Sequence, residues 1–148
     1  MLIDTNILIR TLQPHHELYP LADAAVQRLP LQGRILAITP QNLIELWAVA
    51  TRPIEQNGLG FSISAAVSEL ERIKAMFVLL PDTPAIYPAW ESRGMRYHVS
   101  GKPTHDARLV AAMQVHGVTA ILTFDRTGFS RYPGIEVVHP ADVVATAT

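Results

Sequence analysis

Two aspartates stand near the ends of strand-like stretches of the sequence. Asp4 follows the apolar run Met1–Ile3, and Asp125 closely follows the run Ala120–Thr123. In open parallel sheets the carboxyl ends of the strands form the crevice where ligands bind, so two acids placed there independently indicate a site. For either aspartate alone, a helix cap or a turn is the more common role.

Two further acids lie in stretches with helical periodicity. Asp106 falls in the first turn of the segment Thr104–Gly117, where a favourable interaction with the helix dipole explains it by itself. Glu45 lies in the second turn of another helical stretch, opposite the apolar face formed by Leu43, Trp47 and Ala50. It shares its own face with Gln41, Asn42, Ala48, Val49 and Arg52. Such a face suits solvent as well as a cleft.

Taken together, the four carboxylates predict a site for a hard divalent cation. Mg²⁺ prefers oxygen ligands, keeps several waters, and is usually held by one or two carboxylates while a substrate phosphate completes its octahedral shell. Such an ion lowers the pKa of a bound water and neutralises charge on a phosphodiester during in-line attack. Without a cation, four clustered acids would repel a phosphate group and one another.

The overall composition limits the class of protein. The chain has 148 residues, is 49% hydrophobic, and carries a net charge of −1, so we expect one domain spanning residues 1–148 rather than a disordered or globally basic chain. It contains no Cys, which excludes disulfides and thiolate metal sites and fits an intracellular compartment. Asp4 interrupts the first apolar run too early for a secretory or membrane segment. We therefore expect a soluble, cytoplasmic protein that does not interact with membranes.

The elements that must position these acids follow from the pattern of apolar residues. Short runs alternate with longer helical segments, which predicts a single α/β domain with a mostly parallel sheet and helices on both faces. We predict five strands, at Met1–Ile3, Ile35–Thr39, Phe77–Leu80, Ala120–Thr123 and Glu136–Val138. Helical segments are predicted at 20–29, 39–52, 62–76, 83–97 and 104–117, with Thr39 and Thr104 as N-caps and Gly117 as a C-terminal stop.

Four motifs occur in order along nearly the whole chain. They are LIDTNIL at 2–8, NLIELWAVATRP at 42–53, HDARLVAAM at 105–113 and ILTFDRTGFSRYPGIEVVHP at 121–140. In this order and spacing they resemble a PIN domain, particularly the VapC-like toxins of bacterial toxin–antitoxin pairs. The resemblance implies a Mg²⁺- or Mn²⁺-dependent endoribonuclease, a hydrolase, with RNA as its substrate. It also implies a small antitoxin partner and a homodimer.

The resemblance also implies roles for individual residues. The four acids Asp4, Glu45, Asp106 and Asp125 match the catalytic acids of the family, and Asp4, Asp106 and Asp125 are the expected metal ligands. Asn6 and Thr123 match polar residues that hold the carboxylates in position. For these two, hydrogen bonding within turns and caps remains an equally good explanation.

Basic side chains gather between Arg93 and Arg108. The candidates for RNA contacts are Arg93, Arg96, Lys102 and Arg108, together with Arg126 near Asp125. Tyr97 and His98 add possible stacking partners for unpaired bases. A solvated loop and helix end is the competing interpretation of each of these residues.

Two other functional classes compete with the nuclease. A phosphatase with Asp4 as covalent nucleophile typically has a second acid two residues later, and this chain has Asn6 there. A non-catalytic RNA-binding or protein-interaction module of the same fold is the main alternative. The presence of all four acids favours the nuclease.

Overall fold

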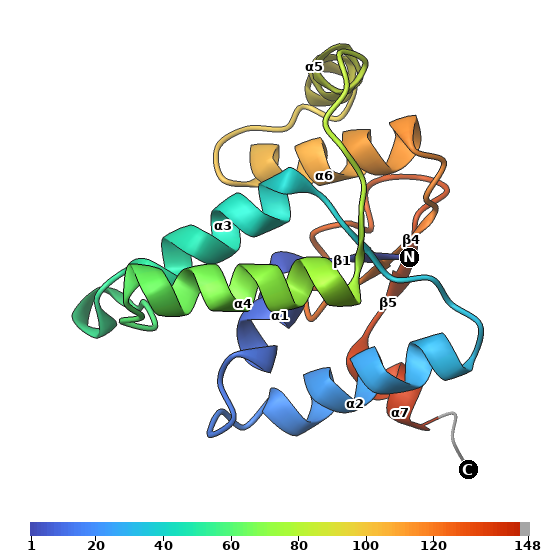
Figure 1. Cartoon of the computed structure of the whole chain (residues 1–148). Coiled ribbons are helices and arrows are strands. Elements are labelled where there is room, and N and C mark those ends of the chain that lie inside the picture. Colours follow the sequence, from blue (N-terminus) through green and yellow to red (C-terminus); the bar gives the residue numbers. More distant parts are fainter. Residues whose placement is uncertain (146–148) are drawn as a thin grey trace.

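The sheet of this computed structural model, which describes residues 1–145, has five parallel strands (Figure 1). They are β1 (Leu2–Ile3), β2 (Ala37–Ile38), β3 (Val78–Leu79), β4 (Ala120–Leu122) and β5 (Glu136–Val138), in the order β3-β2-β1-β4-β5. Every neighbouring pair is parallel, so the predicted α/β class is confirmed and the sheet is wholly parallel. The last three residues of the predicted domain, 146–148, lie outside the described part.

Seven α-helices occur within the described residues. They are α1 (Thr5–Thr11), α2 (Tyr19–Leu31), α3 (Pro40–Thr51), α4 (Ile63–Met76), α5 (Ile86–Arg96), α6 (Pro103–Val115) and α7 (Pro140–Ala145), with one short 3-10 turn at Ile54–Gln56. The five predicted helical segments correspond to α2 to α6. Two short helices, α1 and α7, are not predicted, because six or seven residues are too few to show a helical period.

Two layers of helices cover the sheet, as the alternation of strand side chains requires. Ile3, Ile38 and Leu122 face a core built with helices α1 to α4 and α7, whereas Leu2 and Ile121 face a second core built with α6. Figure 1 shows α5 and α6 stacked above the sheet and α2 with α7 below it. The prediction of helices on both faces is confirmed.

Local sequence explains where the two helices nearest the acids begin. Thr39 caps α3 as predicted: its side chain accepts a hydrogen bond from the Asn42 amide, and the Asn42 side chain accepts one from the Thr39 amide. The predicted cap of α6 is wrong. That helix begins at Pro103, whose fixed φ suits a first helical position, and the Thr104 hydroxyl instead donates to the carbonyl of Gly101.

The ends of the other helices follow the same rules. Pro88 is the third residue of α5, where a missing N–H costs no intrahelical bond. Gly117, with φ +67°, follows the end of α6, as predicted. No helix among the described residues is long and apolar enough to cross a membrane.

Candidate active site

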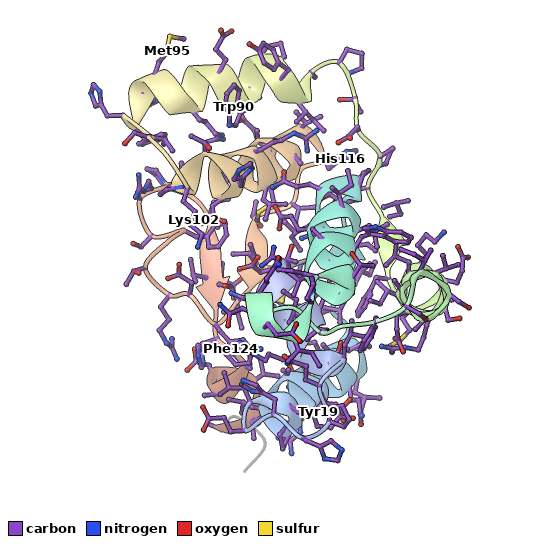
Figure 2. All side chains as sticks on the ribbon, turned by 90° about the vertical axis from the view of Figure 1, so that its left-hand side faces the viewer. Tyr19, Trp90, Met95, Lys102, His116 and Phe124 are labelled. Atoms are coloured by element: carbon purple, nitrogen blue, oxygen red, sulfur yellow. The ribbon has the colours of Figure 1, made fainter. Side chains whose placement is uncertain are left out.

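A cleft of about 790 Å³ opens at the carboxyl ends of β1 and β4. All four predicted acids line it, with side chains from α1, α3, the start of α6 and the loop after β4. The lining residues are Asp4, Thr5, Asn6, Ile9, Glu45, Ala48, Val49, Arg52, Lys102, Pro103, His105, Asp106 and Asp125. Figure 2 shows Lys102 in the segment that leads into α6, above Phe124, the residue between Thr123 and Asp125. The structure thus brings together acids separated by up to 121 positions.

Asp4 is buried at the junction of β1 and α1. Its amide donates to the Leu122 carbonyl at 2.9 Å, and the residue is only 7% exposed. Although Asp4 occupies the N-cap position of α1, its carboxylate makes no capping hydrogen bond. Instead, Oδ2 accepts a 2.7 Å bond from the Thr123 hydroxyl. Burial raises the pKa of Asp4 to about 6, against the opposing effect of the Thr123 bond and with a smaller contribution from the Asp106 charge.

The hydroxyl of Thr123 joins three parts of the site. Besides donating to Asp4, it accepts bonds from Asn6 Nδ2 at 3.1 Å and from the Asp125 amide at 2.9 Å. Asn6 Oδ1 in turn accepts from the Phe124 amide at 3.3 Å. These bonds fix the loop that carries Asp125 against the start of α1, so the two acids hold a constant relative position.

Glu45 is held by two donors that the sequence argument did not single out. Its Oε2 accepts a 2.6 Å bond from the Thr5 hydroxyl, and its Oε1 accepts a 2.7 Å bond from Gln41 Nε2. The Thr5 hydroxyl is itself the acceptor of a 3.1 Å bond from Asn42 Nδ2. The face of α3 that the sequence leaves open to either solvent or a cleft therefore lines the cleft. The i, i+4 spacing of Gln41 and Glu45 was the available signal.

Gln41 also ties α3 to α6. Its Nε2 donates to the His105 carbonyl at 2.8 Å, and its Oε1 accepts from Arg108 Nη1 at 3.2 Å. Figure 1 shows the first turns of α3 and α6 close to each other. Because Asp106 follows His105 directly, this bridge sets the position of Asp106 relative to Glu45.

Removing the bridge is expected to destabilise the fold. Gln41→Leu removes the side-chain donor to the His105 carbonyl and to Glu45, and should lower the free energy of unfolding by about 1 kcal/mol, measured by urea denaturation. Gln27→Leu is the matched control, since Gln27 lies on the exposed face of α2 and its amide donates only to Asp23. Equal stability of the two variants would contradict the bridging role.

Asp106 and Asp125 face one small volume beside Gly128. A methyl group placed on the Gly128 Cα would lie 2.5 Å from Asp125 Oδ2 and 3.5 Å from Asp106 Oδ2. Asp125 Oδ1 accepts from the Thr127 amide, the Thr127 hydroxyl and the Gly128 amide, at 2.9–3.0 Å. One oxygen of Asp125 therefore forms a turn of the kind that Asp often makes, and the other is left facing Asp106.

The charges of these two acids respond differently to their surroundings. Burial raises the pKa of Asp106, with further contributions from the negative charges of Glu45 and Asp125. The Gly128 amide and the Thr127 donors lower the pKa of Asp125, which is well solvated. The cleft thus combines an ionised acid at its rim, Asp125, with two acids, Asp4 and Asp106, whose negative charges have too few nearby donors or positive charges to balance them.

The donor set suits a hard divalent cation. Carboxylate oxygens are the ligands that Mg²⁺ and Mn²⁺ prefer, and a dication would relieve the uncompensated charge at Asp4 and Asp106. The absence of a side chain on Gly128 lets Asp125 Oδ2 lie against the backbone there, beside Asp106. Within residues 1–145, no three His, Asp or Glu side chains converge as a preformed cage. An ion here would therefore be held by one or two carboxylates with water completing its shell, which is the usual arrangement for Mg²⁺.

Of the five basic residues predicted to contact RNA, only Lys102 lines the cleft. Arg108 lies behind its wall, bonded to Gln41 and to Asp82. The other three face elsewhere: Arg126 forms a two-bond ion pair with Asp142, Arg93 donates to Gln114, and Arg96 lies over the Tyr97 ring. Their contact with RNA remains a prediction.

Comparisons with known proteins agree with this geometry. The family model of the PIN domain matches residues 1–135. A comparison with curated protein sequences finds no significant match.

Several solved structures share the fold. VapBC2 from Rickettsia felis, bound to a promoter DNA fragment, superposes with a TM-score of 0.67 at 15% identity, covering 93% of this chain and 96% of that chain. A toxin–antitoxin complex from Klebsiella pneumoniae gives 0.63 at 20% identity, covering 94% and 96%. VapC20 of Mycobacterium tuberculosis, a toxin that cleaves the sarcin–ricin loop, gives 0.61 at 18% identity, covering 86% and 91%. With its sequence match and its fold in agreement, the chain belongs to the PIN domain family.

Proposed function

We propose that this protein is a metal-dependent endoribonuclease that hydrolyses RNA phosphodiester bonds. The observation that carries the proposal is the convergence of Asp4, Glu45, Asp106 and Asp125 on one cleft, with Asp4 and Asp106 poorly compensated. Family membership supports it, and so does the fold shared with VapC20, an RNA-cleaving toxin. A purely structural role would not require buried acids facing a solvent-filled space.

Each residue of the cleft has a proposed role that follows from its position. Asp4 and Asp106 would hold Mg²⁺ or Mn²⁺, directly or through water, and Asp125 Oδ2 would reach the ion's shell through a water at the rim. When bound, such an ion supplies an activated water and neutralises charge on the reacting phosphate. Each Glu45 carboxylate oxygen accepts one hydrogen bond and can accept another. Glu45 can therefore accept a hydrogen bond from the attacking water and orient it. Thr123 and Asn6 keep Asp4 and the Asp125 loop in register.

We further infer that the protein is the toxin of a toxin–antitoxin pair. The solved structures that share its fold include such complexes from Klebsiella pneumoniae and Rickettsia felis. A small antitoxin and a homodimeric assembly are the partners that follow from this inference. The non-catalytic alternative of the same fold has no specific observation in its favour, since all four acids are present and face the cleft.

The activity of the purified chain tests the proposal directly. Incubation with a structured RNA and Mg²⁺ or Mn²⁺ should produce defined fragments, and a chelator should stop the reaction. RNA binding measured in parallel separates the alternatives. Binding without cleavage, across several RNAs and both ions, would replace the nuclease with the non-catalytic module.

The space beside Gly128 gives a second prediction. In Gly128→Ala the new Cβ would meet Asp125 Oδ2 at 2.5 Å, and Asp125 cannot turn freely because Oδ1 is bound by three donors. We expect roughly 10–100-fold slower cleavage, the usual effect of displacing a ligand's support, with little change in melting temperature. Gly94→Ala is the matched control, because its Cβ would meet nothing within 4 Å. A Gly128→Ala enzyme as active as Gly94→Ala would show that Asp125 is dispensable.

A further inference from the structure

One cation of the cleft was assigned no role from the sequence. Arg52 lines the cleft at the end of α3, is exposed, and makes no side-chain hydrogen bond or ion pair within the described residues. Many other arginines are already engaged with carboxylates, as Arg34, Arg72, Arg108 and Arg126 are. Arg52 therefore keeps its full capacity for an external anion.

Arg52 continues a stripe along α3 that begins at the proposed catalytic acids. Gln41, Glu45, Val49 and Arg52 follow one another at helical spacing, and all but Gln41 line the cleft. Seven residues of helix, about 10 Å, separate Arg52 from Glu45. Between them the lining is apolar, with Ala48 and Val49 from α3 and Ile9 from α1.

The cleft is asymmetric along this stripe. At one end Gln41 joins α3 to the His105 carbonyl of α6, which brings the two helices together. At the other end lies Arg52, whose backbone is fixed by the loop that follows. The Gly60 amide donates to the Arg52 carbonyl at 2.9 Å, and Gly58 packs so closely that an added Cβ would lie 1.9 Å from the same oxygen. Arg52 thus projects from a rigid position.

We propose that Arg52, Ile9, Ala48 and Val49 form a subsite for one unpaired nucleotide adjacent to the scissile phosphate of the RNA. The guanidinium of Arg52 binds that nucleotide's phosphate, and its base packs on the apolar floor. The subsite deepens the proposed nuclease function and rests on it.

The order of groups along the cleft matches a nucleic acid strand. An acidic cluster that takes a cation suits the reacting phosphate, the apolar floor suits a base turned out of a stack, and an unpaired Arg suits the next phosphate. A base that must be splayed onto this floor has to be unpaired, so the subsite selects single-stranded segments of RNA.

The test is a double-mutant cycle between Arg52 and the RNA backbone. RNA binding is measured by fluorescence anisotropy in the Asp106→Asn background, with oligonucleotides in which one phosphate at a time is replaced by an uncharged methylphosphonate. Arg52→Gln, which keeps the aliphatic stem, should weaken binding about 5–10-fold and lower the salt dependence by about one charge. One methylphosphonate next to the cleavage site should weaken binding to the parent and have no effect on Arg52→Gln.

A matched control removes the same charge elsewhere. Arg72 on α4 pairs with Glu69 outside the cleft and is not among the predicted RNA contacts, so Arg72→Gln should change neither affinity nor salt dependence. An RNA with an abasic nucleotide at the assigned position should bind the parent protein more weakly, and Val49→Ser should weaken binding of the intact RNA. The two changes together should weaken binding no more than either one alone. Thermal unfolding confirms that the variants are folded.

The outcomes separate this inference from the function beneath it. If the wild type cleaves RNA and Arg52→Gln behaves like Arg72→Gln, the subsite is wrong and the nuclease stands. If the wild type neither binds nor cleaves RNA, the proposed function itself fails. If Arg52→Gln leaves RNA binding intact but abolishes binding of an antitoxin, the surface belongs to the protein partner and the nucleotide subsite is overturned.

Discussion

Replacement of Asp106 with Asn should reduce RNA cleavage by at least about 100-fold. Asn keeps the size of the side chain and its place in the first turn of α6, but it removes the negative charge that faces Asp125 beside Gly128. A cation would then lose one of the two carboxylates proposed to hold it. Initial rates at saturating Mn²⁺, followed on a labelled RNA, measure the effect.

Asp23→Asn provides the comparison for this variant. Asp23 lies on α2, outside the cleft, where its carboxylate accepts a bond from Gln27, and its loss should leave the rate unchanged. Isothermal titration of Mn²⁺ into the two proteins gives a second reading that is independent of turnover. Persistent cleavage by a folded Asp106→Asn protein would exclude Asp106 from the metal site.

Replacement of Asp4 with Asn should stabilise the protein at neutral pH in the absence of divalent cations. The carboxyl binds its proton more tightly in the folded chain, because burial raises its pKa from 3.8 to about 6. Stability is therefore lost as the pH rises from about 4 to about 6, and the full penalty is present above that range. The shift corresponds to about 3 kcal/mol, and Asn, which cannot ionise, should recover most of it.

Urea denaturation at two pH values in a chelating buffer checks this expectation. At pH 7.5 the Asp4→Asn variant should exceed the wild type by up to about 3 kcal/mol, and at pH 4.5 the difference should fall to about 1 kcal/mol. A difference that is equal at both values would show that the charge of Asp4 costs nothing in the fold. The same variant should have lost RNA cleavage. The charge of Asp4 would then lower the stability of the fold while being needed for activity.

The strands and the longer helices could be predicted because their patterns are local. All five strands lie within the predicted runs, and Pro40, Thr39 and Gly117 mark helix ends through rules that involve only a few neighbours. Thr104 shows the limit of those rules. Pro103 was an equally good start for α6, and the choice between the two depends on the loop that precedes them.

The four acids of the candidate site could be predicted from the sequence, but the side chains that hold them by hydrogen bonds could not. Asp4 and Asp125 follow the carboxyl ends of two strands, which is where parallel sheets bind ligands. Thr5 and Gln41 donate hydrogen bonds to Glu45, and Gln41 also bonds the His105 carbonyl. These bonds depend on how α1, α3 and α6 pack together, which the periodicity of one helix does not reveal. The same holds for the basic residues: Arg93 and Arg126 are near the acids in sequence, yet their partners Gln114 and Asp142 direct them elsewhere.

The hydroxyl of Thr123 has a consequence for how the protein is made. It bonds Asp4 and Asn6, which are synthesised more than a hundred residues before Thr123. The central strand β1 likewise completes its pairing only with β4. A nascent chain that has not yet emerged past Asp125 therefore cannot assemble the acidic cluster, which forms only after both halves of the sheet are available.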